Sequence, residues 1–106
     1  MRTDQDAREQ IFQIVQELFA MGQLTPTGGN ISARGTDDDK IWITPSQMYK
    51  GGLQVSDIVC IDRNGELVEG SSKPSIEFQM HWACYDARDG MVAAVHTHAP
   101  YVTAFG

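Results

Sequence analysis

Apolar side chains near the start of the chain recur every three or four residues, the spacing that lines one face of a helix. They are Ile11, Ile14, Val15, Leu18 and Phe19. Thr3 or Asp4 can cap the start of this helix, and Gly22 can end it. The stripe therefore predicts an N-terminal helix that packs its apolar face on a core.

Short apolar runs separated by turn signals follow. Residues 30–34 ("NISAR") and Ile41–Thr44 flank a charged turn, which predicts a hairpin. Ile58–Asp62 and residues 67–70 ("LVEG") flank Asn64-Gly65, the strongest short hairpin signal. The middle of the chain is therefore expected to form antiparallel strands.

The period then changes back to that of a helix. Ser75 is a natural N-cap and Gly90 a natural stop. The residues that share one face at helical spacing are Ile76, Met80, Ala83, Cys84 and Ala87. Residues 91–98 ("MVAAVHTH") predict a strand buried on both faces and broken by Pro100. Residues 101–106 ("YVTAFG") are expected to open another helix.

The order helix, antiparallel strands, helix, strand predicts an α+β or layered α/β fold. At 106 residues, the length fits one domain or part of one. The last residues stop in the middle of an expected element. We therefore expect residues 1–106 to be the N-terminal part of a single domain, truncated at its C-terminus.

Charge and composition exclude several classes of protein. The formal net charge of −6 disfavours non-specific binding to nucleic acid, which needs Lys and Arg against phosphates. No apolar run is long enough for a transmembrane helix, and the charged start does not resemble a secretory leader. Cys60 and Cys84 form no CxxC motif and indicate cytosolic thiols. We expect a cytoplasmic protein without a membrane or nucleic-acid partner.

Two histidines at the end of the apolar strand suggest a metal site. On a strand, His96 and His98 point to the same face, roughly 7 Å apart along the chain, so both imidazoles can bind one ion. Two polar side chains at a strand end are the simpler alternative. Glu77, at the start of the preceding helix, supplies a carboxylate nearby. His81, four residues after Glu77, fits a supporting hydrogen bond better than a metal ligand.

The HxH pair also fits a cupin motif, in which Gly precedes it by six residues. A cupin requires Glu four or five residues after the second histidine, where this chain has Val102 and Thr103. The helical pattern around the motif also conflicts with an all-β barrel. The cupin interpretation is therefore disfavoured.

A glycine-rich segment suggests an anion site. Gly28 and Gly29 permit positive φ, so successive N–H groups can form an anion-binding concavity. The hydroxyl of Thr27 and the amide of Asn30 add donors. An ordinary glycine-rich turn before a strand is an equal alternative. Ser75 can cap a helix and contact an anion at the same helix start.

Five motifs occur in an order that resembles the class II aldolase/adducin family. They are "GGNIS", "ITPS", the run from "DIVCID" to "EG", "KPSIE" and "HTHAP", from about residue 27 to residue 99. The resemblance implies a three-layer α/β/α fold around a mainly antiparallel central sheet. It also implies a homotetramer with zinc sites near the subunit interfaces.

The resemblance assigns roles to individual residues. His96 and His98 match metal ligands for Zn²⁺ or another divalent ion, and Glu77 matches a catalytic acid/base that can also contact the metal. The positions that match phosphate or substrate contacts are Thr27, Gly28, Asn30, Ser46 and Ser75. Gln47 and Ile76 depart from the family, which has Gly and Ser there. The family's third metal histidine lies beyond the last residue.

These roles predict a zinc-dependent lyase of the class II aldolase type. It would cleave or rearrange a small phosphorylated sugar or keto compound through a metal-stabilised enediolate. The same residues also fit an epimerase, a dehydratase or a decarboxylase of the family. A non-catalytic, adducin-like assembly module is the alternative of another class, and the presence of both histidines and Glu77 argues against it.

Overall fold

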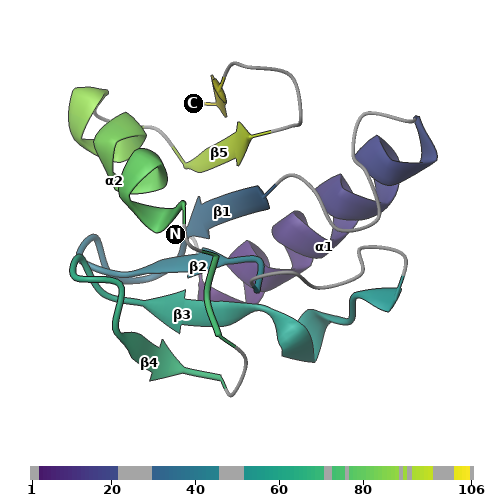
Figure 1. Ribbon diagram of the computed structural model, residues 1–106, viewed down its shortest axis with the longest axis horizontal. Coiled ribbons are helices and arrows are strands. Elements are labelled where there is room, and N and C mark those ends of the chain that lie inside the picture. Colours follow the sequence, from purple (N-terminus) through teal and green to yellow (C-terminus); the bar gives the residue numbers. More distant parts are fainter. Residues whose placement is uncertain are drawn as a thin grey trace.

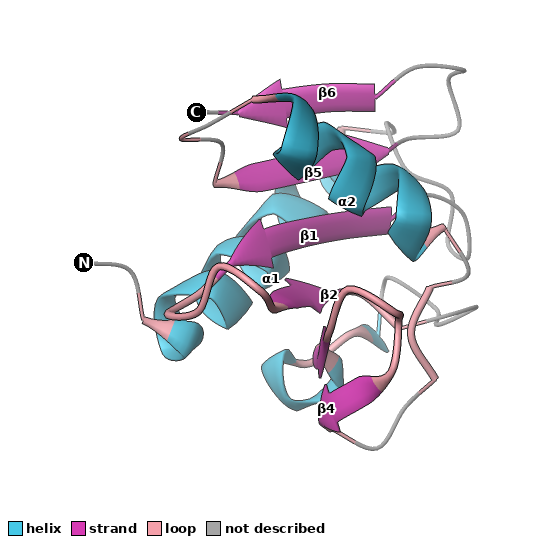
Figure 2. Cartoon of the chain, turned by 90° about the vertical axis from the view of Figure 1, so that its left-hand side faces the viewer, coloured by secondary structure: helices cyan, strands magenta, loops and turns pink. Residues whose placement is uncertain are grey.

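The protein forms an antiparallel sheet with one helix on each face (Figures 1 and 2). The computed structural model describes residues 3–21, 30–45, 52–70, 73–75, 77–88, 90, 92–96 and 102–105, the last four and residue 96 by their backbone alone. Within these residues the sheet has six strands in the order β4-β3-β2-β1-β5-β6, and each described pair is antiparallel. The layered α+β arrangement predicted from the sequence is confirmed.

The strands divide into a meander and a returning pair. Their bounds are β1 Asn30–Arg34, β2 Ile41–Ile43, β3 Val59–Ile61, β4 Leu67–Glu69, β5 Ala93–His96 and β6 Val102–Phe105. A short 3-10 helix, η2, covers Val55–Asp57. Strands β1 to β4 pair in chain order, whereas β5 returns to pair with β1. This return places β5 beside the first strand, with β6 on its outer side.

The first helix, α1, spans Asp4–Ala20 and begins with a capping box. Thr3 Oγ1 accepts a hydrogen bond from the Asp6 N–H, and Asp6 Oδ2 accepts one from the Thr3 N–H, both over 3.0 Å. The predicted helix and its Thr3 cap are confirmed. Met21 is the C-cap residue, and the predicted stop at Gly22 lies outside the described residues.

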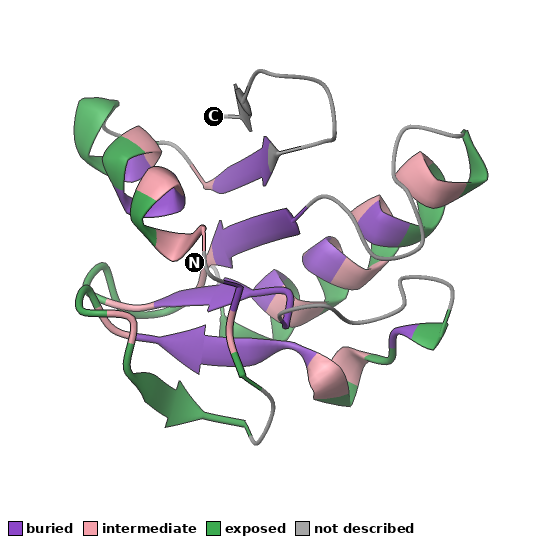
Figure 3. Ribbon diagram, viewed as in Figure 1, coloured by how far each residue is buried: buried purple, intermediate pink, exposed green. Residues whose placement is uncertain are grey.

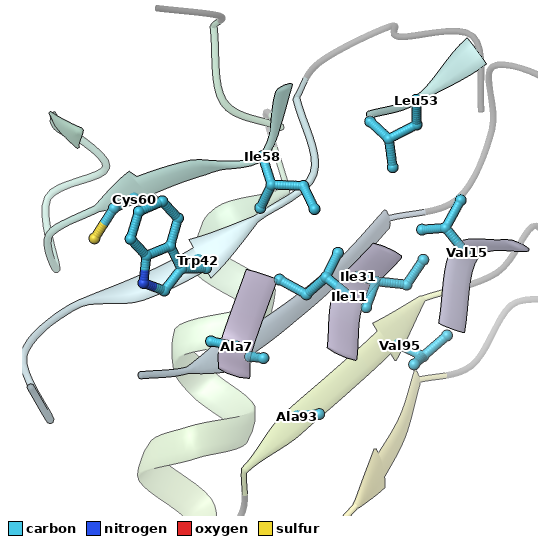
Figure 4. Close-up of a cluster of buried hydrophobic side chains, with 11 residues drawn as sticks. Ala7, Ile11, Val15, Ile31, Trp42, Leu53, Ile58, Cys60, Ala93 and Val95 are labelled. Carbon is cyan, nitrogen blue, oxygen red and sulfur yellow. The ribbon is translucent and has the colours of Figure 1, made fainter. Parts of the chain in front are cut away.

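One face of the sheet packs on α1 and forms the larger core (Figures 3 and 4). Its buried residues are Ala7, Ile11, Val15, Ile31, Ala33, Trp42, Leu53, Ile58, Cys60, Ala93 and Val95. Phe12, Ile14, Leu18 and Phe19 pack against this cluster. The helical stripe read from the sequence therefore forms the expected core face.

Both predicted hairpins are present. β1 pairs with β2, and β3 pairs with β4. In the second turn, Asp62 Oδ1 accepts hydrogen bonds from the N–H groups of Asn64 and Glu66. Gly65 has φ of +81°, and a Cβ there would collide with the ring of Phe78. The Asn-Gly signal thus marks a turn that only glycine fits.

The second helix, α2, spans Phe78–Ala87 and buries a different face from the predicted one. The buried residues are His81, Trp82 and Tyr85, whereas Ala83 and Ala87 are exposed. The aromatic face is buried because it removes more apolar area from water and because the polar atoms of its side chains find hydrogen-bond partners. Trp82 Nε1, for example, donates to a backbone carbonyl over 3.0 Å.

The predicted ends of α2 also need correction. Glu77, not Ser75, occupies the N-cap position, and Arg88 is the C-cap residue. Gly90 lies in the following turn with φ of +81°. Ser75 instead accepts a hydrogen bond from the Glu77 N–H, so its hydroxyl supports the residue that begins the helix.

Strand β5 is buried on both faces, as predicted. Ala93 and Val95 belong to the core beneath α1, and Ala94 belongs to the cluster beneath α2. The expected helix after Pro100 is wrong, because residues 102–105 form β6 on the outer edge of β5. The backbone of a buried strand needs hydrogen-bond partners on both sides, and this requirement outweighs weak local helix signals. No helix among the described residues is both long and apolar enough to cross a membrane.

Candidate active site

Two polar motifs that are distant in sequence lie side by side. Pro45 and Pro74 form an isolated antiparallel bridge, and the Ser75 N–H donates to the Thr44 carbonyl over 3.3 Å. Thr44 Oγ1 in turn accepts from the Ile31 N–H over 3.2 Å. These bonds attach the segment that carries the candidate residues Ser75 and Glu77 to the end of the β1–β2 hairpin.

Glu77 lies at the junction of this segment with α2. It is half-buried, and its N–H donates to Ser75 Oγ over 3.2 Å. Its Oε2 accepts a hydrogen bond from Asn30 Nδ2 over 3.1 Å. Two candidate residues, Ser75 and Asn30, therefore contact Glu77 through its backbone and its side chain respectively.

Asn30 also contacts α2 at a second point. Its Oδ1 is hydrogen-bonded to His81 Nε2, and both side chains are buried. His81 Nδ1 is 2.6 Å from Ser32 Oγ, which is 2.8 Å from the Tyr85 hydroxyl. The supporting hydrogen bond expected for His81 is confirmed.

Sequence reasoning did not assign Ser32 and Tyr85 to this group. A signal was present, because Glu77, His81 and Tyr85 recur every four residues and so share a helix face. On β1, Asn30 and Ser32 alternate with buried apolar residues, which indicates a polar row on one face of a central strand. Two polar rows that face each other across a buried interface must be hydrogen-bonded together.

Backbone register places the first candidate metal ligand beside this group. His96 is the strand partner of Asn30 in the β1–β5 pair. Directly opposed residues in an antiparallel pair have Cα atoms about 4.5–5.5 Å apart. The backbone position of His96 therefore adjoins the residue that holds Glu77.

The remaining candidate residues cannot be placed. Thr27, Gly28, Ser46 and His98 lie outside the described residues, as does the side chain of His96. Among the side chains that the structure does describe, no three His, Cys, Asp or Glu residues gather in a way that could hold a metal ion. The metal and phosphate assignments therefore remain predictions.

The family described as "Class II Aldolase and Adducin N-terminal domain" matches residues 9–106, and the chain belongs to this family. A 5-deoxy-D-ribulose 1-phosphate aldolase from Bacillus thuringiensis is 36% identical over 92% of this chain and 46% of its own length. An L-fuculose phosphate aldolase from Methanococcus maripaludis is 38% identical over 91% of this chain and 51% of its own. An L-ribulose-5-phosphate 4-epimerase from Salmonella paratyphi C is 33% identical over 95% of this chain and 44% of its own length.

Solved structures agree. An L-fuculose 1-phosphate aldolase superposes with a TM-score of 0.80 at 33% identity, over 94% of this chain and 47% of that one. YgbL from Klebsiella pneumoniae, described as a putative aldolase/epimerase/decarboxylase, superposes with a TM-score of 0.81 at 34% identity, over 95% of this chain and 48% of that one. The chain thus spans about half the length of the relatives that it matches. The relatives compared by sequence are named as two aldolases and one epimerase.

Proposed function

We propose that this chain is the N-terminal part of a longer, metal-dependent lyase of the aldolase type that acts on a small phosphorylated carbonyl compound. The observation that carries the proposal is the fixed position of Glu77, which Asn30 and Ser75 hold beside the strand that ends at His96. A homotetramer, as the family resemblance implies, and a cytoplasmic location belong to the same proposal. Two free cysteines, Cys60 and Cys84, support the location.

The donor types fit a divalent metal. Imidazoles from His96 and His98 and the carboxylate of Glu77 are ligands that zinc and its neighbours prefer. A further histidine would have to come from outside this chain. When bound, the ion would act as a Lewis acid that polarises the substrate carbonyl.

Glu77 would transfer the proton. An acid/base group must combine an ionisable atom with a defined direction, because proton transfer requires hydrogen-bond reach to the reacting atom. The Ser75 hydroxyl fixes the backbone of Glu77, and the Asn30 amide fixes one carboxylate oxygen. These contacts restrict the carboxylate to one region beside β1.

The substrate phosphate would lie next to Glu77. Asn30 and Ser75 are each 6% exposed, so donors on either side of the carboxylate are fixed by their surroundings. The other proposed phosphate contacts are Thr27, Gly28 and Ser46. Hydroxyl and backbone N–H donors suit a phosphate in a chain whose net charge is negative.

Related reactions use the same residues. One relative is a 4-epimerase, which favours epimerisation as the second candidate. Dehydration or decarboxylation would also need a held carboxylate beside a polarised carbonyl. A non-catalytic assembly module would not need Glu77 in a fixed position, and this argues against it.

The test is a substrate panel on the full-length protein. L-Fuculose 1-phosphate and 5-deoxy-D-ribulose 1-phosphate would be assayed for carbon–carbon cleavage, and L-ribulose 5-phosphate for epimerisation. Glu77→Gln should lower turnover of the accepted substrate by at least ~10²-fold, because it keeps the shape and removes the acid/base. Glu69→Gln, the same change on exposed β4, is the matched control. Near-normal turnover by Glu77→Gln would assign the proton transfer to another residue.

A further inference from the structure

Five side chains from β1 and α2 form one continuous hydrogen-bonded chain that ends at Glu77. In order they are Tyr85, Ser32, His81, Asn30 and Glu77. We infer that His81 is a positioning residue, which sets the orientation of the Asn30 amide and through it the Glu77 carboxylate. This inference rests on the proposed role of Glu77 in proton transfer.

The chain lies in the protein interior for most of its length. Ser32 is 0% exposed, Tyr85 and His81 are 1% exposed, and Asn30 is 6% exposed. A buried donor or acceptor that loses its partner keeps the cost of its desolvation without a hydrogen bond to offset it. Each hydrogen bond of the series therefore constrains the next, and a change in one side chain alters the position of its neighbour.

The chemistry of the end groups fixes the direction of the chain. A carboxylate oxygen only accepts hydrogen bonds, so the amide must present Nδ2 to Glu77 and Oδ1 to His81. His81 Nε2 must then carry a proton and donate to Asn30. With Nδ1 unprotonated, the Ser32 hydroxyl donates to the imidazole and accepts from Tyr85. A neutral Nε2–H imidazole thus lets each group donate toward Glu77.

The donor-to-acceptor direction of these hydrogen bonds explains what His81 contributes to the position of Glu77. Without a donor at Nε2, only the Glu77 carboxylate itself would distinguish the two ends of the Asn30 amide. A flipped amide would turn its carbonyl oxygen toward the Glu77 carboxylate and repel it. His81 is therefore the group that keeps the amide in the orientation that supports Glu77.

The Tyr85 end of this hydrogen-bonded series is held in place. The guanidinium carbon of Arg34 lies 4.9 Å from the centre of the Tyr85 ring, which is a cation–π contact. Arg34 also donates to the Tyr85 carbonyl over 3.2 Å. The ring that begins the hydrogen-bonded chain is therefore fixed by a contact between β1 and α2.

Two substitutions at one position separate positioning from bulk packing. In His81→Gln, the side-chain amide can reach the place of Nε2 and still donate to Asn30. In His81→Asn, the shorter amide can still contact Ser32 but cannot reach Asn30. We expect His81→Gln to keep kcat near normal and His81→Asn to lower kcat by about 10- to 100-fold, the usual effect of losing a group that orients a functional residue. KM should change less than kcat in both, because the other proposed phosphate contacts, Thr27, Gly28, Ser46 and Ser75, are not altered.

A measurement on the unmodified protein tests the same inference without substrate. ¹⁵N NMR of histidine-labelled full-length protein should show His81 as the neutral Nε2–H form, with its signal assigned by its loss in His81→Gln. A neutral Nδ1–H form, which has no donor at Nε2, would overturn the inference. So would normal kcat in folded His81→Asn while Glu77→Gln is inactive.

The outcomes also separate this inference from the proposed function. Normal turnover by Glu77→Gln defeats the proposed role of Glu77 in proton transfer, whatever His81 does. If His81→Asn does not fold, Tyr85→Phe replaces it, since this change keeps the ring and removes the first donor. A Tyr85→Phe protein in which the His81 signals are unchanged would show that the hydrogen-bonded chain does not act as one unit.

Discussion

The side-chain amide of Asn30 donates to Glu77 Oε2 over 3.1 Å, across 47 positions of sequence. Asn30 begins a central strand, and Glu77 begins the helix that crosses the opposite face of the sheet from α1. The bond therefore joins two elements that the remaining contacts already hold rigidly. Glu77, as the proposed acid/base group, would keep its direction during repeated turnover when it is supported in this way.

Substitution of Asn30 should separate the two roles that this residue can have. Asn30→Asp keeps an acceptor for His81 but places a second carboxylate against Glu77. We expect kcat to fall by at least ~10-fold with KM changed less, because like charges displace the Glu77 side chain. Steady-state kinetics with the accepted sugar phosphate would measure both constants.

Asn64→Asp, in the exposed β3–β4 turn, is the matched control. A rise in KM with normal kcat in Asn30→Asp would instead indicate that Asn30 mainly binds the substrate phosphate. In that case the contact with Glu77 would have no catalytic importance.

Removal of either proposed imidazole ligand should remove the metal. The full-length protein is expected to bind about one Zn²⁺ or similar ion per subunit, and His96→Ala or His98→Ala should lose most of it. Elemental analysis after dialysis gives the metal content of each variant. His81→Gln should keep its metal, because His81 contacts Asn30 and Ser32 inside the protein. Unchanged metal in both alanine variants would refute the assignment.

The thiol of Cys60 should react slowly. Burial, followed by the nearby negative charges of Asp4 and Glu69, raises its pKa to about 11. The reactive thiolate therefore forms only in a small fraction of molecules near neutral pH. In a thiol-labelling time course at about pH 8, Cys60→Ser should remove a slow phase that appears at full rate in denaturant. Rapid labelling of Cys60 in the folded protein would contradict its burial.

Local signals in the sequence predicted the elements that local bonds determine. Thr3 and Asp6 form a capping box within one helical turn, and Asn64-Gly65 forms a turn with its immediate neighbours. Such features depend on residues three or four positions apart. They could be read from the sequence because no distant partner is needed to form them.

Features that depend on distant partners were harder to predict. The buried face of α2 is set by Ser32 and the β3–β4 turn, which satisfy the polar tips of Tyr85 and Trp82. Residues 102–105 form a strand because β5 offers them a free edge. Glu77 and Asn30 were both identified as candidates. Their contact could not be predicted from their spacing in the sequence, because it forms only when the start of α2 packs beside β1.

Asp4 should make the stability of the fold depend on pH. It lies in the first turn of α1, and its Oδ1 accepts hydrogen bonds from the Thr36 N–H over 3.0 Å and from Trp42 Nε1 over 3.2 Å. These bonds attach the helix start to the β1–β2 hairpin. The Thr36 bond first, and then the Trp42 bond, lower the pKa of Asp4 below its ordinary value of 3.8.

A lowered pKa in the folded state means that folding favours the carboxylate. The stabilisation is therefore complete above the unfolded pKa, near pH 4, and is lost as the pH falls through the folded pKa. Asp4→Asn should lower the free energy of unfolding near pH 7 by about 0.5–1 kcal/mol, a small value because solvent screens this exposed group. The difference from the unmodified protein should shrink as the pH falls below about 4.

Urea unfolding between about pH 3 and pH 7 would measure the difference directly. Asp38→Asn is the control, because it removes a carboxylate from the turn of the hairpin to which Asp4 is bonded. The Asp38 side chain is 91% exposed, and its ion pair with Arg34 is 3.9 Å long. That variant should unfold like the unmodified protein at every pH. If Asp4→Asn showed a constant difference across the range, the side chain would stabilise the helix start by shape alone, and the charge of Asp4 would contribute nothing to the attachment of α1.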